Sequence, residues 1–296
     1  MAKRPTLFPL IPLTPLLLLV IGTSLSGQTP KTADKTALFA IWPAEKGKTP
    51  DAPLLDPIVV LSGMRFQATP DGHTLDRVWD AFQKTHYEAG KKYPVLIAGS
   101  ADGPATVQEA TSISCVSLMA TVALSRPLPD DRVRLAASSL TRLGVHANRD
   151  PEVTKQDRAR FLDLASAYLK EKGVTVAPSR VKINGLYSIS LRADAPDALV
   201  GSITYETKSS IRHLFLLANK VERDYEIDLA NYRVAKDVED HTDDVDEDFV
   251  DHVDLDKDAY DEIITMMHYY ESWNYNIYRK ENGKWKLVYN GGGGGC

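Results

Sequence analysis

From Arg180 to the C-terminus the chain is a succession of short apolar segments separated by turn residues, which restricts this half to antiparallel β structure. The segments lie at residues 188–191, 199–206, 213–218, 225–229, 263–270, 273–279 and 285–289. Short segments at regular spacing are typical of sheets that are built from hairpins. Asn282-Gly283 separates the last two segments, and this dipeptide favours a two-residue β-hairpin turn because both residues tolerate positive φ.

The same pattern occurs twice in this half of the chain. When residues 190–200 are placed on residues 254–264, which is a shift of 64 positions, Leu191 falls on Leu255 and Asp194 falls on Asp258. Each copy is followed by a strand ending in Tyr-Glu and then by a hairpin. A repeat of this length suits a sheet of roughly four short strands. With only two copies, a chance match is the alternative.

The N-terminal half has a mixed pattern. Apolar residues at helical spacing predict one helix over residues 155–172, with Thr154 in the capping position and Gly173 as the stop. The same spacing occurs at residues 74–87. Strands are predicted at residues 37–42, 58–61, 93–97 and 113–123. The fold class is therefore α+β, mainly antiparallel β, with a C-terminal β-meander.

The first 26 residues have the composition of a signal peptide. Two basic residues precede an apolar stretch at 7–21, and small serines follow at 24 and 26. The uninterrupted apolar part is far shorter than the roughly 20 residues that span a bilayer. We expect cleavage near Gly27, no stable membrane insertion afterwards, and a secreted or periplasmic protein; an uncleaved anchor is the alternative.

Composition shifts divide the chain into six parts. They are a signal peptide at 1–26, an exported leader at 27–55, an N-terminal α+β region at 56–178, a degenerate β repeat at 179–236, an acidic linker at 237–248 and a C-terminal β module at 249–296. The linker is predicted from its acidic residues, which favour a solvated segment. The formal net charge of −5 argues against nucleic acid as a partner.

The sequence has two cysteines, Cys115 and Cys296. In an exported chain an even number of cysteines favours a disulfide. Cys296 follows the glycines at 291–295, which form a flexible tail able to reach many points on a surface. We expect a Cys115–Cys296 bond; two unrelated thiols are the alternative.

The segment from Asp254 to Glu262 contains the clearest candidate site. Aspartates stand at alternate positions, Asp254, Asp256 and Asp258, and a tight loop would bring these side chains to its inside. Three converging carboxylates repel one another, and a hard cation such as Ca2+ relieves this repulsion. The EF-hand arrangement fails because its twelfth position is Thr265 instead of glutamate. The alternative is a solvated acidic turn without an ion.

This segment resembles the calcium loop of FG-GAP and VCBS repeats, Asp-x-Asp-x-Asp-Gly-x-x-Asp/Glu followed by an aliphatic residue. The resemblance implies Ca2+ ligands from the side chains of Asp254, Asp256, Asp258 and Glu262 and from the carbonyl of Tyr260. It also implies sheets like propeller blades, although a closed propeller needs four or more blades and the chain shows two. Ala259 stands where the motif has glycine. The first copy has Ser190, Arg192 and Ala198 at ligand positions and is expected to bind no metal.

Other chemical signals are weaker. The histidines at 241, 252 and 268 match no zinc spacing, and no Ser/His/Asp order indicates a catalytic triad. Trp273 and Tyr275 alternate with asparagines, which fits either a core face or a carbohydrate platform. We therefore expect an exported, non-enzymatic protein with one structural calcium site that acts as a binding or interaction module for a protein or a carbohydrate. The alternatives are a secreted hydrolase with a site in the N-terminal region, or a carbohydrate-binding module that uses Trp273 and Tyr275.

Overall fold

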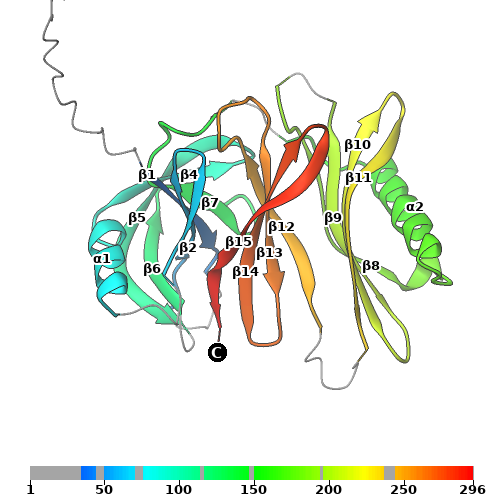
Figure 1. The fold of residues 1–296 in the computed structure, drawn as a ribbon, viewed down its shortest axis with the longest axis horizontal. Coiled ribbons are helices and arrows are strands. Elements are labelled where there is room, and N and C mark those ends of the chain that lie inside the picture. Colours follow the sequence, from blue (N-terminus) through cyan, green and yellow to red (C-terminus); the bar gives the residue numbers. More distant parts are fainter. Residues whose placement is uncertain are drawn as a thin grey trace, which may run out of the picture. The chain divides into compact units, whose positions relative to one another are not determined.

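The computed structural model describes residues 35–44, 50–70, 76–113, 117–146, 150–193, 196–236 and 244–295. Within these residues the protein is mainly antiparallel β with two α-helices (Figure 1). The described residues all belong to one compact unit of the chain. The expected signal peptide lies outside the described residues. Neither helix in the described part is long and apolar enough to cross a membrane.

The first part of this unit is a closed barrel. Its strands are β1 (Lys35–Trp42), β2 (Leu54–Ser62), β4 (Lys92–Ile97), β5 (Ser100–Ile113), β6 (Ser117–Leu124) and β7 (Arg134–Ala137), and β3 (Arg65–Ala68) extends β2 as a hairpin. The ring runs β1-β7-β4-β5-β6-β2 and closes because β1 also pairs with β2. Phe82 and Tyr87, from and just after helix α1 (Asp76–His86), pack into the apolar interior. Closure leaves these six strands without a free edge.

The second half consists of two four-stranded meanders. The first contains β8 (Val181–Ile189), β9 (Ala198–Glu206), β10 (Ile211–Val221) and β11 (Asp224–Ala235); the second contains β12 (Asp246–Val253), β13 (Glu262–His268), β14 (Ser272–Glu281) and β15 (Lys284–Gly295). In both sheets the strand order follows the chain. The second strands begin at Ala198 and Glu262, 64 residues apart. The third strands begin at Ile211 and Ser272, 61 residues apart, and the last at Asp224 and Lys284, 60 residues apart, so most of the shortening lies between the starts of the second and third strands.

The elements stack in layers (Figure 1). Helix α2 (Lys155–Glu171) packs its buried residues Phe161, Ala165 and Leu169 on one face of the first meander. The other face of that meander meets the second meander in a core that includes Phe215 and Ile263. The second meander in turn packs its opposite face on the barrel. Because β13 is covered on both sides, its apolar run is continuous instead of alternating.

Several local predictions are confirmed. Helix α2 begins after Thr154, whose hydroxyl accepts a hydrogen bond from the Asp157 amide while the Asp157 carboxylate accepts one from the Thr154 amide. Asn282 and Gly283 have φ values of 53° and 76° and form the turn between β14 and β15. A single strand over 113–123 is wrong, because β5 ends at Ile113 and β6 begins at Ser117 as its antiparallel neighbour.

Three other boundaries need correction. The strand expected at 37–42 is confirmed as β1, and because β1 is buried in the barrel and β2 begins at Leu54, residues 35–42 and 54–55 belong to the barrel instead of the expected leader at 27–55. The linker expected at 237–248 overlaps β12, in which Glu247 is buried, while residues 237–243 lie outside the described residues. The glycine tail at 291–295 belongs to β15 and pairs with β14. A side chain on Gly292 would collide with the main chain of Pro57 and Ile58, so glycine lets this strand pass close to the barrel.

Candidate functional site

The acidic loop between β12 and β13 is wound tightly around the carboxylate of Asp254. Asp254 Oδ1 accepts hydrogen bonds from the amides of Asp256, at 3.2 Å, and Lys257, at 2.5 Å. Asp254 Oδ2 accepts from the amide of Ala259 at 2.9 Å. Lys257 and Ala259 have positive φ, 65° and 66°, which lets the chain turn back on itself. Ala259 therefore has a backbone conformation that favours glycine.

This winding brings three of the expected ligands together. Oxygens of Asp254, Asp256 and Glu262 all lie within 4.8 Å of one another. The Asp254 and Glu262 side chains are buried, and Glu262 Oε2 accepts the Leu255 amide at 2.7 Å. Asp258 lies at the exposed edge of the loop, where its Oδ1 accepts the Tyr260 amide at 2.8 Å. The carboxylate oxygens of the loop therefore lie close together, and their hydrogen bonds to backbone amides fix the conformation of the loop.

Arg279 on β14 balances part of this negative charge. Its Nε donates to Glu262 Oε1 and lies 3.3 Å from Asp256 Oδ2. Burial raises the pKa of Glu262 to about 7, although the Leu255 amide and Arg279 act in the opposite direction. Burial also raises the pKa of Asp256, with Arg279 opposing the shift and Asp258 adding to it. Both shifts show that negative charge is costly at this site without a cation.

The loop also touches both neighbouring parts of the fold. The Gly144 amide, in the segment that follows β7, donates to the Asp254 carbonyl at 2.8 Å. Gly144 has no room for a side chain, because a Cβ would collide with the Asp254 carboxylate. The Asp261 amide donates to the carbonyl of Leu191 at 2.8 Å, which joins the loop to the corresponding loop of the first meander. The conformation of this loop is therefore coupled to the segment that follows β7 and to both meanders.

A chain of histidine and aspartate beside the loop was not predicted. Asp150 Oδ1 lies 3.0 Å from His252 Nε2, and His252 Nδ1 lies 2.5 Å from Asp261 Oδ2. The same Asp261 oxygen lies 2.8 Å from His146 Nε2. Burial alone would lower the pKa of His252, but the hydrogen bonds to Asp150 and Asp261 outweigh it and raise the pKa to about 10. His146 and Asp150 line an open pocket of about 800 Å3.

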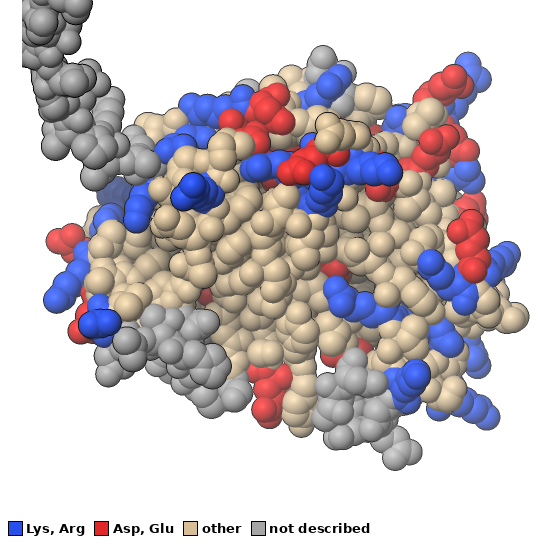
Figure 2. All heavy atoms as spheres, in the orientation of Figure 1, with Lys and Arg blue, Asp and Glu red and all other residues tan. Residues whose placement is uncertain are grey.

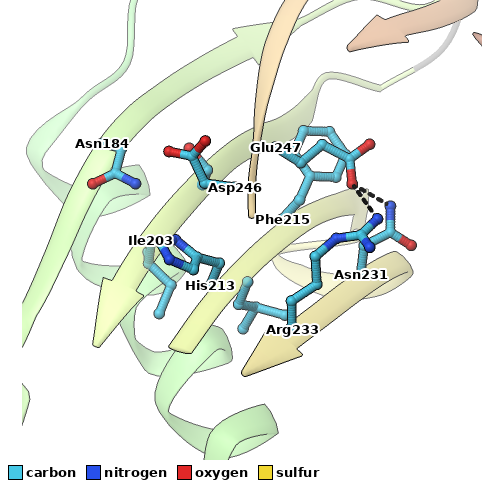
Figure 3. Close-up of a pocket in the computed structure, with 10 residues that line it drawn as sticks. Asn184, Ile203, His213, Phe215, Asn231, Arg233, Asp246 and Glu247 are labelled. Carbon is cyan, nitrogen blue, oxygen red and sulfur yellow. Dashed lines mark hydrogen bonds and ion pairs between the residues drawn. The ribbon is translucent and has the colours of Figure 1, made fainter. Parts of the chain in front are cut away.

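The acid at position 247 holds the two meanders together. Glu247 Oε1 accepts hydrogen bonds from Thr265 and Tyr278, at 2.6 and 2.8 Å, and Oε2 accepts one from Asn231 at 2.9 Å. Figure 3 shows Glu247 beside Asn231 and Arg233, with His213 and Asp246 at the other end of the same slot. Side chains fill this slot and leave no room for a ligand. Its role is therefore structural.

Another buried acid, Asp56 on β2, joins the barrel to the second meander. Its Oδ2 accepts hydrogen bonds from Tyr275 Oη at 2.6 Å, Trp273 Nε1 at 2.7 Å and Trp42 Nε1 at 3.3 Å. Tyr275 is fully buried. Trp273 is half-buried, and because both side chains bond to Asp56 the pair forms no exposed aromatic platform, which argues against the alternative of a carbohydrate site on Trp273 and Tyr275. The alternation of these aromatics marks a core face.

Both cysteines lie outside the described residues, so the expected disulfide remains a prediction. No protein-family model, curated protein or solved structure matches the chain. The proposed function therefore rests on the geometry of the acidic loop and the groups around it.

Proposed function

We propose that this chain is an exported, non-enzymatic binding module whose C-terminal sheet is stabilised by one Ca2+ in the loop between β12 and β13. The observation that carries the proposal is the convergence of Asp254, Asp256 and Glu262 within 4.8 Å. Carboxylate and carbonyl oxygens are the donors that Ca2+ prefers, and the loop provides them without nitrogen or sulfur. Asp258 and the Tyr260 carbonyl complete the proposed ligand set.

The charge of the loop supports a divalent ion. The four proposed carboxylate ligands carry four negative charges when ionised, and the guanidinium of Arg279 offsets one of them. The remaining negative charge favours a divalent cation over a monovalent one. Burial is the main cause of the raised pKa values of Glu262 and Asp256, with a smaller contribution from neighbouring carboxylates, and a bound cation would favour the ionised forms of both acids. Arg279 would then lie beside the ion as a partner of the ligand carboxylates.

The position of the loop supports a structural role. It contacts the segment at Gly144 on one side and the loop at Leu191 on the other. A ligand that binds only the folded chain stabilises it by about 2.7 kcal/mol when its free concentration is a hundred times its dissociation constant. Calcium would thus tighten the contacts among the barrel and both meanders. Exported proteins work where free calcium is abundant, which suits this use.

The sheets support a relationship to propeller blades. Both meanders run in chain order and pack face to face, as neighbouring blades do. The acidic loop joins the first and second strands of its sheet, and residues 190–197 do so in the other. We interpret the first meander as a degenerate copy that has lost the metal. A closed propeller is not part of the proposal, because the barrel occupies the other side of the second meander.

The surface supports a role in binding. On the face in Figure 2 basic and acidic side chains lie mostly toward the edges, and the middle carries largely uncharged residues. Among the described residues, β15 exposes Leu287 and the turn before β14 exposes Tyr270. Uncharged surface with exposed apolar side chains is typical of protein contact areas. A protein partner is therefore the proposed ligand class.

The Cys115–Cys296 disulfide belongs to the same proposal. Strand β15, which ends one residue before Cys296, contacts β6, which begins two residues after Cys115. A bond there would link the last strand to the barrel in an oxidising compartment. Thiol labelling of the unreduced exported protein should find no free cysteine, and two labelled thiols would exclude the bond.

A melting experiment tests the calcium proposal. Calcium at a hundredfold excess over its dissociation constant should raise the melting temperature by about 5 to 10 °C relative to chelator. The variant Asp256→Asn keeps the size of the side chain and should lose this shift. Asp163→Asn, an exposed acid on α2, is the matched control and should keep it. Identical melting curves for the wild type in calcium and in chelator would refute the proposal.

The alternative of a secreted hydrolase is supported by one observation, the open pocket lined by His146 and by residues 97–102 of the barrel. Turnover of chromogenic esters or phosphate monoesters that is lost in His146→Ala would favour this alternative. Absence of turnover across such substrates would favour the binding module.

A further inference from the structure

We propose that His146, His252 and Asp261 form a second metal site, for a first-row transition ion such as Zn2+, at the floor of the open pocket. One candidate ligand atom from each residue lies within 4.8 Å of the other two. His146 comes from the segment after β7, His252 from β12 and Asp261 from the loop before β13. Two imidazole nitrogens and one carboxylate oxygen are a common zinc donor set, with a fourth position left for water or another small ligand.

The outer contacts orient these ligands in the way that metal sites require. Asp150 lies at hydrogen-bond distance from His252 Nε2, which directs Nδ1 toward Asp261. A carboxylate on the far nitrogen of a ligating histidine is the usual second partner in zinc sites. The main chain of Asp261 is fixed by its hydrogen bond to the Leu191 carbonyl. Two of the three ligands are therefore held in place before any ion binds.

The side chain of Asp261 gives a second, independent indication that a cation binds here. Its side chain is only 1% exposed, and its Oδ1 finds no hydrogen-bond partner among the described residues. A buried carboxylate oxygen without a partner is costly, and a bound cation would satisfy it. Gly99 also keeps the space beside this group clear. A side chain there would lie within 3.0 Å of Asp261 Oδ2 and still closer to His146 Nε2.

The pocket makes the group accessible. His146 is 19% exposed and lines the cavity, whereas His252 and Asp261 are buried behind it. An ion held by these three residues would have its open side toward the cavity. The pocket walls carry Arg132 and Arg134, which both pair with Asp130, together with Asp102 and Asp150, so the lining does not favour an anionic ligand.

This site differs from the acidic loop in its choice of metal. Nitrogen donors suit Zn2+ and related ions, whereas an all-oxygen set suits Ca2+. Asp261 and Glu262 are neighbours in sequence, yet Asp261 contacts the histidines and Glu262 contacts Arg279. Successive side chains at the start of a strand point to opposite faces, which explains the separation. The two sites can therefore be tested independently.

Cobalt titration tests the inference on untagged, chelator-treated protein in which Cys115→Ser and Cys296→Ser remove thiol ligands. We expect one Co2+ per chain, visible absorption bands of a four- or five-coordinate ion, and displacement by Zn2+. His146→Ala should weaken binding at least about 100-fold, and Asp150→Asn about 10- to 100-fold, as outer partners do. Circular dichroism and thermal melting confirm that each variant is folded.

Two variants serve as controls. His268→Ala removes a histidine that pairs with Asp248 and lies outside the group, and should leave cobalt binding unchanged. Asp256→Asn alters the calcium loop and should also leave cobalt binding unchanged. Failure of one proposal therefore does not imply failure of the other. Absence of cobalt and zinc binding, or equal binding by wild type and His146→Ala, would show that the group is a hydrogen-bonded ion cluster without a metal.

Discussion

Replacing Asp56 by asparagine should change how the stability of the protein depends on pH. Asp56 is fully buried between the barrel and the second meander, and its Oδ2 accepts hydrogen bonds from Trp42, Trp273 and Tyr275. Burial raises its pKa to about 6, although these three donors act in the opposite direction. The Asp56→Asn side chain keeps an oxygen acceptor of the same size and removes the titration.

The sign and size of the effect follow from this pKa. The folded chain holds a proton that the unfolded chain, with a pKa of 3.8, has already released. The free energy of unfolding contributed by Asp56 therefore falls as pH rises from about 4 to 6 and is level above that range. At high pH the raised pKa of Asp56 lowers the free energy of unfolding by about 3 kcal/mol in total. From pH 4.5 to pH 8 the free energy of unfolding of Asp56→Asn should rise by about 2 kcal/mol relative to that of the wild type.

Urea denaturation of both proteins at several pH values measures this difference. Taking the difference between variant and wild type cancels titrating groups that are distant from Asp56. Tyr275→Phe provides a second measurement, because it removes a hydrogen bond that lowers the Asp56 pKa and should therefore extend the fall in stability to pH values above 6. A difference between Asp56→Asn and wild type that stays constant from pH 4.5 to pH 8 would refute the reasoning.

Two further substitutions test local parts of the account. Ala259→Gly should raise the free energy of unfolding in chelator by about 1 kcal/mol, because Ala259 has a φ of 66°, and lower stability of the variant would contradict this explanation. Thr154→Ala should lower the free energy of unfolding by about 1 kcal/mol, because it removes the side-chain acceptor of the capping box at the start of α2. An unchanged urea midpoint for Thr154→Ala would show that the cap contributes little.

The features that the sequence predicted depend on nearby residues. The turn at Asn282-Gly283 follows from residues that tolerate positive φ, and helix α2 follows from its cap and its apolar spacing. The convergence of Asp254, Asp256 and Glu262 also lies within one short loop. In each case a few neighbouring side chains determine the local backbone, so the pattern can be read without knowledge of the rest of the fold.

The features that were missed depend on distant residues. Barrel closure requires β1 to pair with both β2 and β7, and nothing local to β1 indicates the second pairing. His146 and Asp261 are 115 positions apart in the chain, so no spacing rule joins them. Glu247 lies in an acidic run typical of a linker, and its burial becomes clear only from the partners on β11, β13 and β14. Arg279 reaches the acidic loop from another strand for the same reason.

Calorimetric titration of Ca2+ into chelator-treated protein tests the central claim most directly. The account predicts one Ca2+ per chain with a dissociation constant at or below the millimolar range that is usual for extracellular sites. Asp256→Asn should abolish or strongly weaken this binding, while Asp163→Asn, on the exposed side of α2, should bind like wild type. No heat of binding in wild type at millimolar calcium, or equal binding by Asp256→Asn, would contradict the account.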